Sequence, residues 1–287
     1  MRFPSALLLL TLAAGNPVFA AESDPFNYDQ TAPLDVREAG VEQRGDATVR
    51  DITFVGVKDP INAYLVAPAK PGPHAAILYV HWFGDPKTTN RTQFLDEAVA
   101  LASRGAVSLL VDAMWSKAGW WKGRKPETDF AGGVQQVIEL RRALDLLLSQ
   151  PGVEAQRLAL VAHDFGAMFG AVMGAVDHRP KTYVLMAPTP RLADWYLFNV
   201  KPASLDDYKK DLSPLDPVNA VPKLAPATVF YQFAAKDKYV PLPRPAEFYD
   251  ATQPRKQMAT YDCEHEMLLP EIAADRGAWL ERELELK

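Results

Sequence analysis

Three residues with the side chains of a catalytic triad stand shortly after predicted strands. Asp164, Asp237 and His265 each follow an apolar or β-branched run that is typical of a buried strand. Because the carboxyl ends of parallel strands open on one crevice, we expect these three side chains to meet there. A histidine that is oriented by one carboxylate can assist a second reactive group. The spacing therefore predicts a catalytic site built from Asp164, His265 and Asp237.

The sharpest local pattern lies in residues 157–167, where an apolar run ends abruptly and a helical pattern begins. Ala162 and Gly166 flank Asp164, and small residues are needed there because a sharp strand-to-helix turn brings neighbouring backbone close. Turns of this kind usually lift a Ser or Cys to their apex, whereas this chain has an Asp. The pattern predicts a nucleophile elbow that presents a carboxylate.

The chain order of nucleophile, acid and histidine resembles that of the α/β-hydrolases. Residues 50–285 resemble the dienelactone-hydrolase group, and the segments that carry this resemblance are Asp51-Ile-Thr-Phe, Ala63-Tyr-Leu-Val-Ala-Pro, Ile77-Leu-Tyr-Val-His-Trp and Leu101-Ala-Ser-Arg-Gly-Ala-Val-Ser-Leu-Leu-Val-Asp. The elbow His163-Asp164-Phe165-Gly166 is instead similar to that of epoxide hydrolases and haloalkane dehalogenases. These resemblances imply an α/β-hydrolase fold with Asp164 as the nucleophile.

Two segments depart from these families. Trp82 follows His81 at a position where the families usually place Gly, so the geometry around the loop after this strand is expected to differ. Residues 188–227 are few for the helical cap of epoxide hydrolases. The resemblance therefore implies a minimal cap, and no cap residue is carried over to this chain.

An aspartate at the apex favours attack on saturated carbon. A carboxylate that displaces a leaving group there forms an alkyl ester. Water activated by His265 can then hydrolyse that ester while Asp237 orients the imidazole. The leading hypothesis is a hydrolase of dehalogenase or epoxide-hydrolase type. It would act on a small, fairly apolar substrate through a covalent ester on Asp164.

Loop residues beside the elbow are expected to shape the substrate pocket. Backbone N–H groups of Phe165 and of Trp82 or Phe83 would stabilise the oxyanion that forms on the aspartyl group. An indole N–H can polarise a leaving group, and an indole face can bind an apolar substrate. Further tryptophans in loops after predicted strands are expected to line the pocket: Trp115, Trp120, Trp121 and Trp195.

Two other functions fit the same residues. A carboxylic-ester or lactone hydrolase, suggested by the dienelactone-like first half, would use Asp164 as a base toward water. A non-catalytic binding protein on the same fold would keep Asp164 as a relic. For the acid of the triad, Asp194 is a weaker substitute for Asp237, because it lies after the preceding strand.

The remaining histidines and the cysteine have plainer interpretations. His81 and His163 stand beside the site and are expected to be buried, hydrogen-bonded supports. Cys263 is expected to be a packed thiol, since a lone cysteine cannot form an internal disulfide. His265-Glu266 lacks the second histidine that a zinc-protease helix requires. We therefore expect neither a metal nor a cofactor, and a small molecule as the substrate.

The rest of the chain has the pattern of a sheet covered on both faces. Apolar runs alternate with helical periodicities, which predicts a mostly parallel sheet. The expected strands are residues 51–57, 61–67, 75–81, 107–112, 158–163, 182–187, 228–233 and 257–261, and the expected helices are 93–104, 130–149, 166–176 and 271–286. The first two strands should form an antiparallel pair. Residues 21–48 lack periodicity, and residues 188–227 are expected to be irregular.

The N-terminal residues and the net charge indicate the compartment of the protein and limit the partners that it can bind. Arg2, a short apolar stretch and the motif Val18-Phe19-Ala20 predict a signal peptide over residues 1–20, followed by one α/β-hydrolase domain over 21–287. The product is then expected to be periplasmic or secreted and to have no contact with the membrane. A net charge of −5 over 287 residues argues against a nucleic-acid partner. The sequence leaves the oligomeric state and the substrate open.

Overall fold

A nine-stranded sheet spans the molecule in the computed structural model, which describes residues 24–241, 243–253 and 255–287. The strands are β1 (Arg37–Arg44), β2 (Ala47–Val55), β3 (Pro60–Pro68), β4 (His74–Val80), β5 (Ala106–Val111), β6 (Val153–His163), β7 (Thr182–Met186), β8 (Thr228–Ala234) and β9 (Lys256–Tyr261). Their spatial order is β1-β2-β3-β5-β4-β6-β7-β8-β9. The pairs from β5 onward are parallel, and those before it are antiparallel.

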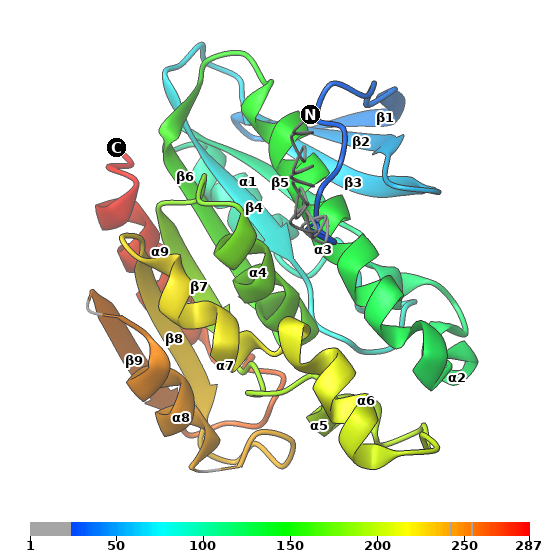
Figure 1. The fold of residues 1–287 in the computed structure, drawn as a ribbon. Coiled ribbons are helices and arrows are strands. Elements are labelled where there is room, and N and C mark those ends of the chain that lie inside the picture. The colour runs from blue at the N-terminus through cyan, green and yellow to red at the C-terminus, as the bar shows by residue number, and fades with distance from the viewer. Residues whose placement is uncertain (1–23, 242, 254) are drawn as a thin grey trace, which may run out of the picture.

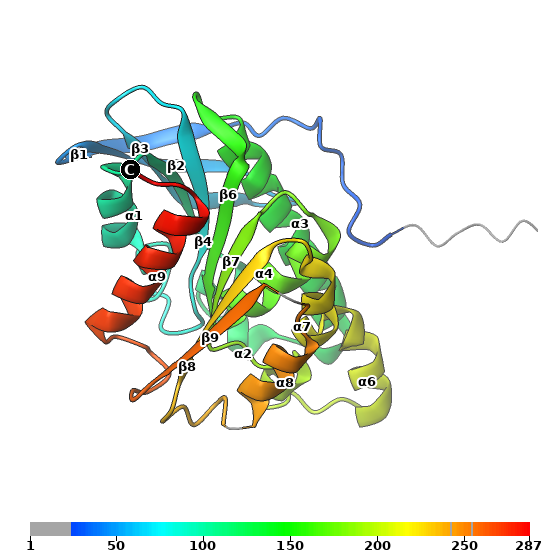
Figure 2. The same ribbon diagram turned by 90° about the vertical axis from the view of Figure 1, so that its left-hand side faces the viewer.

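Helices cover both faces of this sheet. The α-helices are α1 (Leu95–Ala102), α2 (Trp120–Gly123), α3 (Pro126–Leu148), α4 (Phe165–Val176), α5 (Ala193–Tyr196), α6 (Leu205–Leu212), α7 (Pro217–Ala220), α8 (Arg244–Ala251) and α9 (Pro270–Glu283), and the 3-10 turns are η1 (Met114–Ser116), η2 (Ser213–Leu215) and η3 (Val221–Leu224). Figure 2 shows α1 and α9 on one face and α3, α4 and α7 on the other. Two apolar cores result, one on each side of the sheet.

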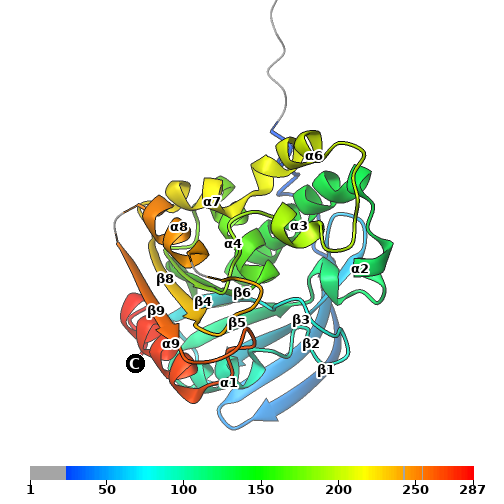
Figure 3. The same ribbon diagram turned by 90° about the horizontal axis from the view of Figure 1, so that it is seen from below.

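The buried strands explain why the sheet has two covered faces. Every residue of β4, β5, β7 and β8 is buried, so these strands cannot leave one face in water. β5 pairs with one edge of β4, and β6 pairs with the other edge of β4. The strand order therefore reverses at β4, and a crevice is expected beyond the carboxyl ends at such a point. Figures 1 and 3 place the loops after β4, β6 and β8 together at this end.

The predicted α/β architecture is correct, and the predicted antiparallel pair corresponds to β2 and β3. One strand was missed, because the prediction left residues 21–48 without structure. β1 lies there and pairs with β2 at the edge of the sheet. Its side chains are almost all exposed, so no apolar alternation marks it in the sequence. Backbone pairing with β2 defines this strand.

The expectation that residues 188–227 are irregular is also wrong. This segment contains α5, α6 and α7 with two 3-10 turns, and none of these helices exceeds eight residues. Helices this short hold fewer than three turns, so they produce no apolar periodicity to detect. Local signals were present instead. Ser204 caps α6 by accepting a bond from the Asp207 amide, and Pro217 starts α7.

The predicted signal peptide, residues 1–20, lies outside the described residues. Within the described ranges, no helix combines the length and the apolar character needed to cross a membrane.

Candidate active site

The elbow predicted at Asp164 is present between β6 and α4. Asp164 has φ 52° and ψ −116°, a backbone conformation that residues with a side chain rarely adopt. Its amide donates to the Met186 carbonyl at 2.8 Å, which ties the turn to β7. A Cβ on Gly166 would lie 2.4 Å from the Val80 carbonyl oxygen. Only glycine therefore lets α4 pack this closely against the end of β4.

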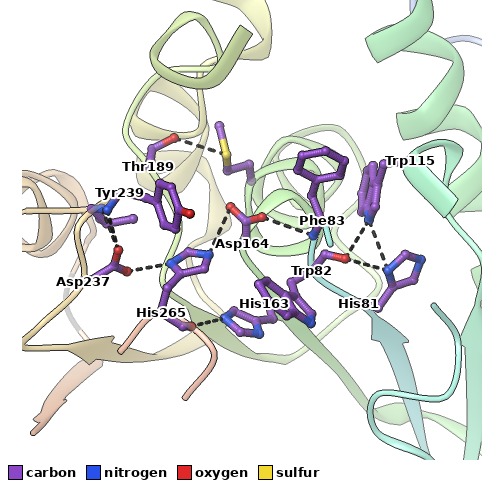
Figure 4. Close-up of polar contacts among 12 residues, drawn as sticks. His81, Trp82, Phe83, Trp115, His163, Asp164, Thr189, Asp237, Tyr239 and His265 are labelled. Carbon is purple, nitrogen blue, oxygen red and sulfur yellow. Dashed lines mark hydrogen bonds and ion pairs between the residues drawn. The ribbon is translucent and has the colours of Figure 1, made fainter. Parts of the chain in front are cut away.

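The structure brings the three predicted triad residues together (Figure 4). His265 Nδ1 lies 2.7 Å from Asp237 Oδ2, a short hydrogen bond between buried groups. The other carboxylate oxygen of Asp237 accepts the backbone N–H groups of Tyr239 and Val240. On its far side, His265 Nε2 lies 3.8 Å from Asp164 Oδ1. The imidazole is thus held by one carboxylate and faces a second across a short gap.

The two carboxylates control the charge of the imidazole between them. Burial alone would lower the pKa of His265, but Asp164 and Asp237 outweigh it and raise the pKa from 6.5 to about 10. Burial likewise opposes ionisation of Asp237, yet the bond to His265 holds the pKa of this carboxyl below its ordinary value. At neutral pH the site therefore contains an imidazolium between two acceptor groups.

This charge predicts a pH-dependent stability. A pKa raised on folding stabilises the native state fully below pH 6.5, and this contribution is lost as the pH rises toward about 10. Asp164→Asn removes one of the charges that raise the pKa of His265, so the loss of stability over this window should be smaller. Urea unfolding of both proteins at pH 6 and pH 10 measures this. Equal losses in the two proteins would contradict the assignment of charge to His265.

One backbone donor already occupies the second oxygen of the elbow carboxylate. The Phe83 amide donates to Asp164 Oδ2 at 3.2 Å. The Trp82 amide donates instead to Gln93 Oε1 at 2.9 Å, so of the two alternatives Phe83 is the one whose amide faces the elbow carboxylate. Phe165 is the first residue of α4, and its amide has no acceptor within the helix. Of the predicted donors, Phe83 contacts the carboxylate, and the Phe165 amide follows Asp164 directly at the start of α4.

A chain of side-chain hydrogen bonds that the sequence did not reveal supports His265. Gln93 donates through Nε2 to His163 Nδ1 at 2.9 Å, and His163 Nε2 donates to the His265 carbonyl at 3.0 Å. Burial holds the pKa of His163 well below its usual range, so this ring stays neutral. Trp82 stacks on the same ring. His163 is therefore the predicted buried support, and Gln93, which belongs to no motif, sets its orientation.

His81 and Trp115 brace the loop that follows β4. His81 Nδ1 donates to the Trp82 carbonyl at 2.8 Å, and its Nε2 accepts the Ala113 amide at 3.1 Å. Burial lowers the pKa of His81 to about 4, so it too is neutral. Trp115 is 1% exposed and lies 3.2 Å from the Trp82 carbonyl through its Nε1. This indole therefore packs against the loop after β4, and its predicted role in a substrate pocket stays a prediction.

Aromatic side chains gather around Phe165, directly beside the elbow. The ring of Phe165 lies 5.4 Å from Phe83, 6.0 Å from Trp120, 6.3 Å from Trp121 and 5.6 Å from Trp195, measured between centroids. Trp195 is buried, and the other indoles are half-buried. The Trp115 ring also lies 5.6 Å from Phe165, so all four predicted pocket tryptophans contribute to one aromatic cluster beside the site. Asp164 is 0% exposed beneath it.

The other candidate residues from the sequence lie outside the site formed by Asp164, Asp237 and His265. Asp194 forms an ion pair with Arg244 rather than with His265. Cys263 is a free, partly buried thiol whose pKa burial and neighbouring carboxylates raise, which keeps it protonated. Among the described residues, no group of His, Cys, Asp and Glu side chains is arranged to hold a metal ion.

Comparison with known proteins yields relatives in structure alone. No protein-family model matches this sequence, and no curated protein sequence matches it. An acetyl xylan esterase from Paenibacillus sp. R4 superimposes with a TM-score of 0.70 at 18% identity, covering 87% of this chain and 89% of its own. Acetyl xylan esterase 1 from Thermoanaerobacterium sp. JW/SL YS485 gives 0.71 at 16% identity, covering 89% and 91%.

A third similar structure is a 2,6-dihydroxy-pseudo-oxynicotine hydrolase, with a TM-score of 0.63 at 15% identity, covering 81% of this chain and 67% of its own. At such low sequence identity these similarities show the fold alone and do not identify the site residues of this chain. The strand order of the sheet, the sharp turn after β6 and the extent of these superpositions all indicate the same fold. The chain therefore adopts the α/β-hydrolase fold, with a mostly parallel sheet and helices on both faces.

Proposed function

We propose that this protein is a hydrolase of a small, fairly apolar carboxylic ester or lactone. The observation that carries the proposal is the pair formed by Asp164 Oδ1 and His265 Nε2. These atoms face each other at 3.8 Å, are buried, and have no hydrogen-bond partner. The carboxylate has an oxygen that can accept a proton, and the imidazolium has an N–H that can donate one. The two groups therefore form a base and an acid side by side. The esterases of the same fold support an ester as the bond that is cleaved.

In this proposal Asp164 acts as the base toward water. The carboxylate takes one proton from a water molecule while the water oxygen attacks the ester carbonyl carbon. The C=O electron pair moves to the carbonyl oxygen and then re-forms the double bond as the C–O bond to the alcohol breaks. His265, charged because its pKa is about 10, gives its proton to the departing alkoxide. Proton transfer from Asp164 to the neutral His265 restores the starting state.

The surroundings favour a substrate without charge. The aromatic cluster around Phe165 offers apolar surface, which favours an uncharged substrate. Because Asp164 is closed to solvent, side chains around it must move for a substrate to reach it. A short-chain ester or a small lactone meets these requirements.

A second candidate, a covalent ester on Asp164, is favoured by the bond from the Phe83 amide. With Oδ2 held by that N–H at 3.2 Å, Oδ1 is the free oxygen that could displace a leaving group from saturated carbon. Esterification would remove the negative charge of Asp164, which helps to raise the pKa of His265. The imidazole would then become a base at the step that needs one. Halides and epoxides are the substrates of this route.

Turnover and mass analysis with one variant test the two candidates. p-Nitrophenyl acetate, dihydrocoumarin, 1,2-dibromoethane and styrene oxide are offered to the wild-type protein and to His265→Gln. The ester route predicts wild-type cleavage of the first two compounds and an unmodified Asp164 in the variant. The covalent route predicts an alkyl adduct that accumulates on Asp164 of His265→Gln. Equal turnover of every cleaved compound by both proteins would exclude a catalytic role for this site.

A further inference from the structure

Unpartnered polar atoms concentrate at the candidate active site. Across the described ranges, six buried side-chain nitrogen or oxygen atoms have no hydrogen-bond partner. Three of them belong to this site: Asp164 Oδ1, His265 Nε2 and Trp195 Nε1. Leaving a buried donor unpaired is costly, so proteins rarely keep one without a use. The proposed mechanism employs the first two atoms and leaves the indole N–H of Trp195 unexplained.

Trp195 lies against the reacting groups. It belongs to α5, is 8% exposed, and its ring centroid is 6.0 Å from His265 and 5.6 Å from Phe165. Tyr239, from the loop that carries Asp237, packs on the indole at 5.0 Å. The indole thus contacts the elbow, the histidine loop and the acid loop at once. A small molecule bound against His265 and Phe165 would therefore lie beside this indole.

The proposed ester chemistry needs such a donor. As water attacks, negative charge develops on the carbonyl oxygen of the substrate and must be stabilised. In this fold the loop after β4 usually supplies a backbone N–H. Here the Phe83 amide is bonded to Asp164 Oδ2 and the Trp82 amide to Gln93. The Trp115 indole lies within hydrogen-bond distance of the Trp82 carbonyl. The amide of Phe165 remains available, with the indole of Trp195.

We propose that the Trp195 indole N–H is a catalytic oxyanion donor, acting together with the Phe165 amide on the carbonyl oxygen of the ester. This inference rests on the proposed function and deepens it. The side-chain donor takes the place of the backbone N–H that Asp164 itself occupies. The carboxylate at the elbow and the indole on α5 are then two parts of one adaptation, because the first removes the donor that the second supplies.

The attachments of α5 hold the indole in place before a substrate arrives. Asp216 Oδ1 accepts the amide of Leu192, the residue that precedes the helix, at 2.9 Å. The Trp195 amide donates to the Leu192 carbonyl at 3.2 Å. A donor that is fixed in advance requires no reorganisation during the reaction, which is the condition for effective charge stabilisation.

Trp195→Phe tests this inference, since it removes the N–H and keeps an aromatic ring. We expect kcat for p-nitrophenyl acetate to fall about 100-fold while KM changes less than about threefold, because the donor acts on charge formed in the transition state. Asp194→Asn is the control. It alters the same helix without changing the indole and should keep kcat within about threefold. Circular dichroism and the Tm of each variant check folding.

A binding measurement gives an answer that does not depend on turnover. The benzyl monoester of methylphosphonic acid is a tetrahedral anion that mimics the oxyanion. Its binding is followed by calorimetry and by the ¹⁵N–¹H signal of the Trp195 indole, which is assigned by its absence from Trp195→Phe. We expect this signal to move downfield on binding and affinity to fall at least tenfold in Trp195→Phe.

The two proposals fail in different ways. A kcat for Trp195→Phe within threefold of wild type, an indole signal that does not move, or a phosphonate that does not bind would each overturn the oxyanion role. The ester proposal survives the first two results as long as Asp164→Asn is inactive on the ester. If Asp164→Asn keeps wild-type turnover, the proposed function itself is wrong.

Discussion

Asp164→Asn is expected to abolish nearly all activity, lowering kcat/KM by about 10⁴-fold, the loss seen when a member of a catalytic triad is disabled. An amide neither accepts a proton from water nor attacks carbon, so this result is expected for both candidate mechanisms. The amide oxygen can still accept the bond from the Phe83 amide, which holds the carboxylate at 3.2 Å. The fold should therefore be retained, and steady-state kinetics on p-nitrophenyl acetate measures the loss.

The matched control for this variant is Asp194→Asn, which makes the same chemical change on a carboxylate paired with Arg244. Its kcat/KM should stay within about threefold of wild type. A residual activity of Asp164→Asn above a tenth of wild type, with the fold intact, would show that the elbow carboxylate does no chemistry.

Asp237→Asn is expected to produce the second largest loss, about 10³–10⁴-fold in kcat, because the orienting carboxylate of a triad is worth this much elsewhere. Asn keeps an oxygen for the amides of Tyr239 and Val240, so the loop should hold its shape. The charge that Asp237 contributes to the raised pKa of His265 is lost. The imidazolium then deprotonates at lower pH.

The pH profile separates this effect from a structural one. If His265 acts as the acid, the rate of the wild-type enzyme should fall only as the pH approaches about 10, and this limb should move to lower pH in Asp237→Asn. A variant with a reduced rate and an unchanged alkaline limb would contradict the role of Asp237 in charging His265.

The residues that could be predicted are those whose type is dictated by their place on the sheet. Asp164, Asp237 and His265 follow strand ends, and the convergence of parallel strands brings them together whatever the loops between them do. Gly166 could be predicted because a Cβ there would collide with the Val80 carbonyl. The buried, neutral states of His81 and His163 follow from their position in apolar runs.

What could not be predicted depends on backbone direction within loops. Phe83 rather than Trp82 contacts Asp164, because Gln93 binds the Trp82 amide and turns the next N–H toward the elbow. No sequence pattern marks Gln93 as a partner of that loop. Trp115 has the same sequence context as the other loop tryptophans, yet it is inserted beneath the loop. Side-chain burial of this kind is decided by tertiary packing.

A single-turnover experiment in H₂¹⁸O tests most directly whether Asp164 acts as a base toward water. Excess enzyme is mixed with phenyl acetate. After one turnover, mass spectrometry measures the ¹⁸O content of the acetate and of the tryptic peptide that contains Asp164. The proposal predicts acetate that carries one ¹⁸O from the solvent and an unlabelled Asp164, because water attacks the substrate directly. Unlabelled acetate together with ¹⁸O in Asp164 would contradict it, since the new acetate oxygen would then have come from the carboxylate through a covalent intermediate.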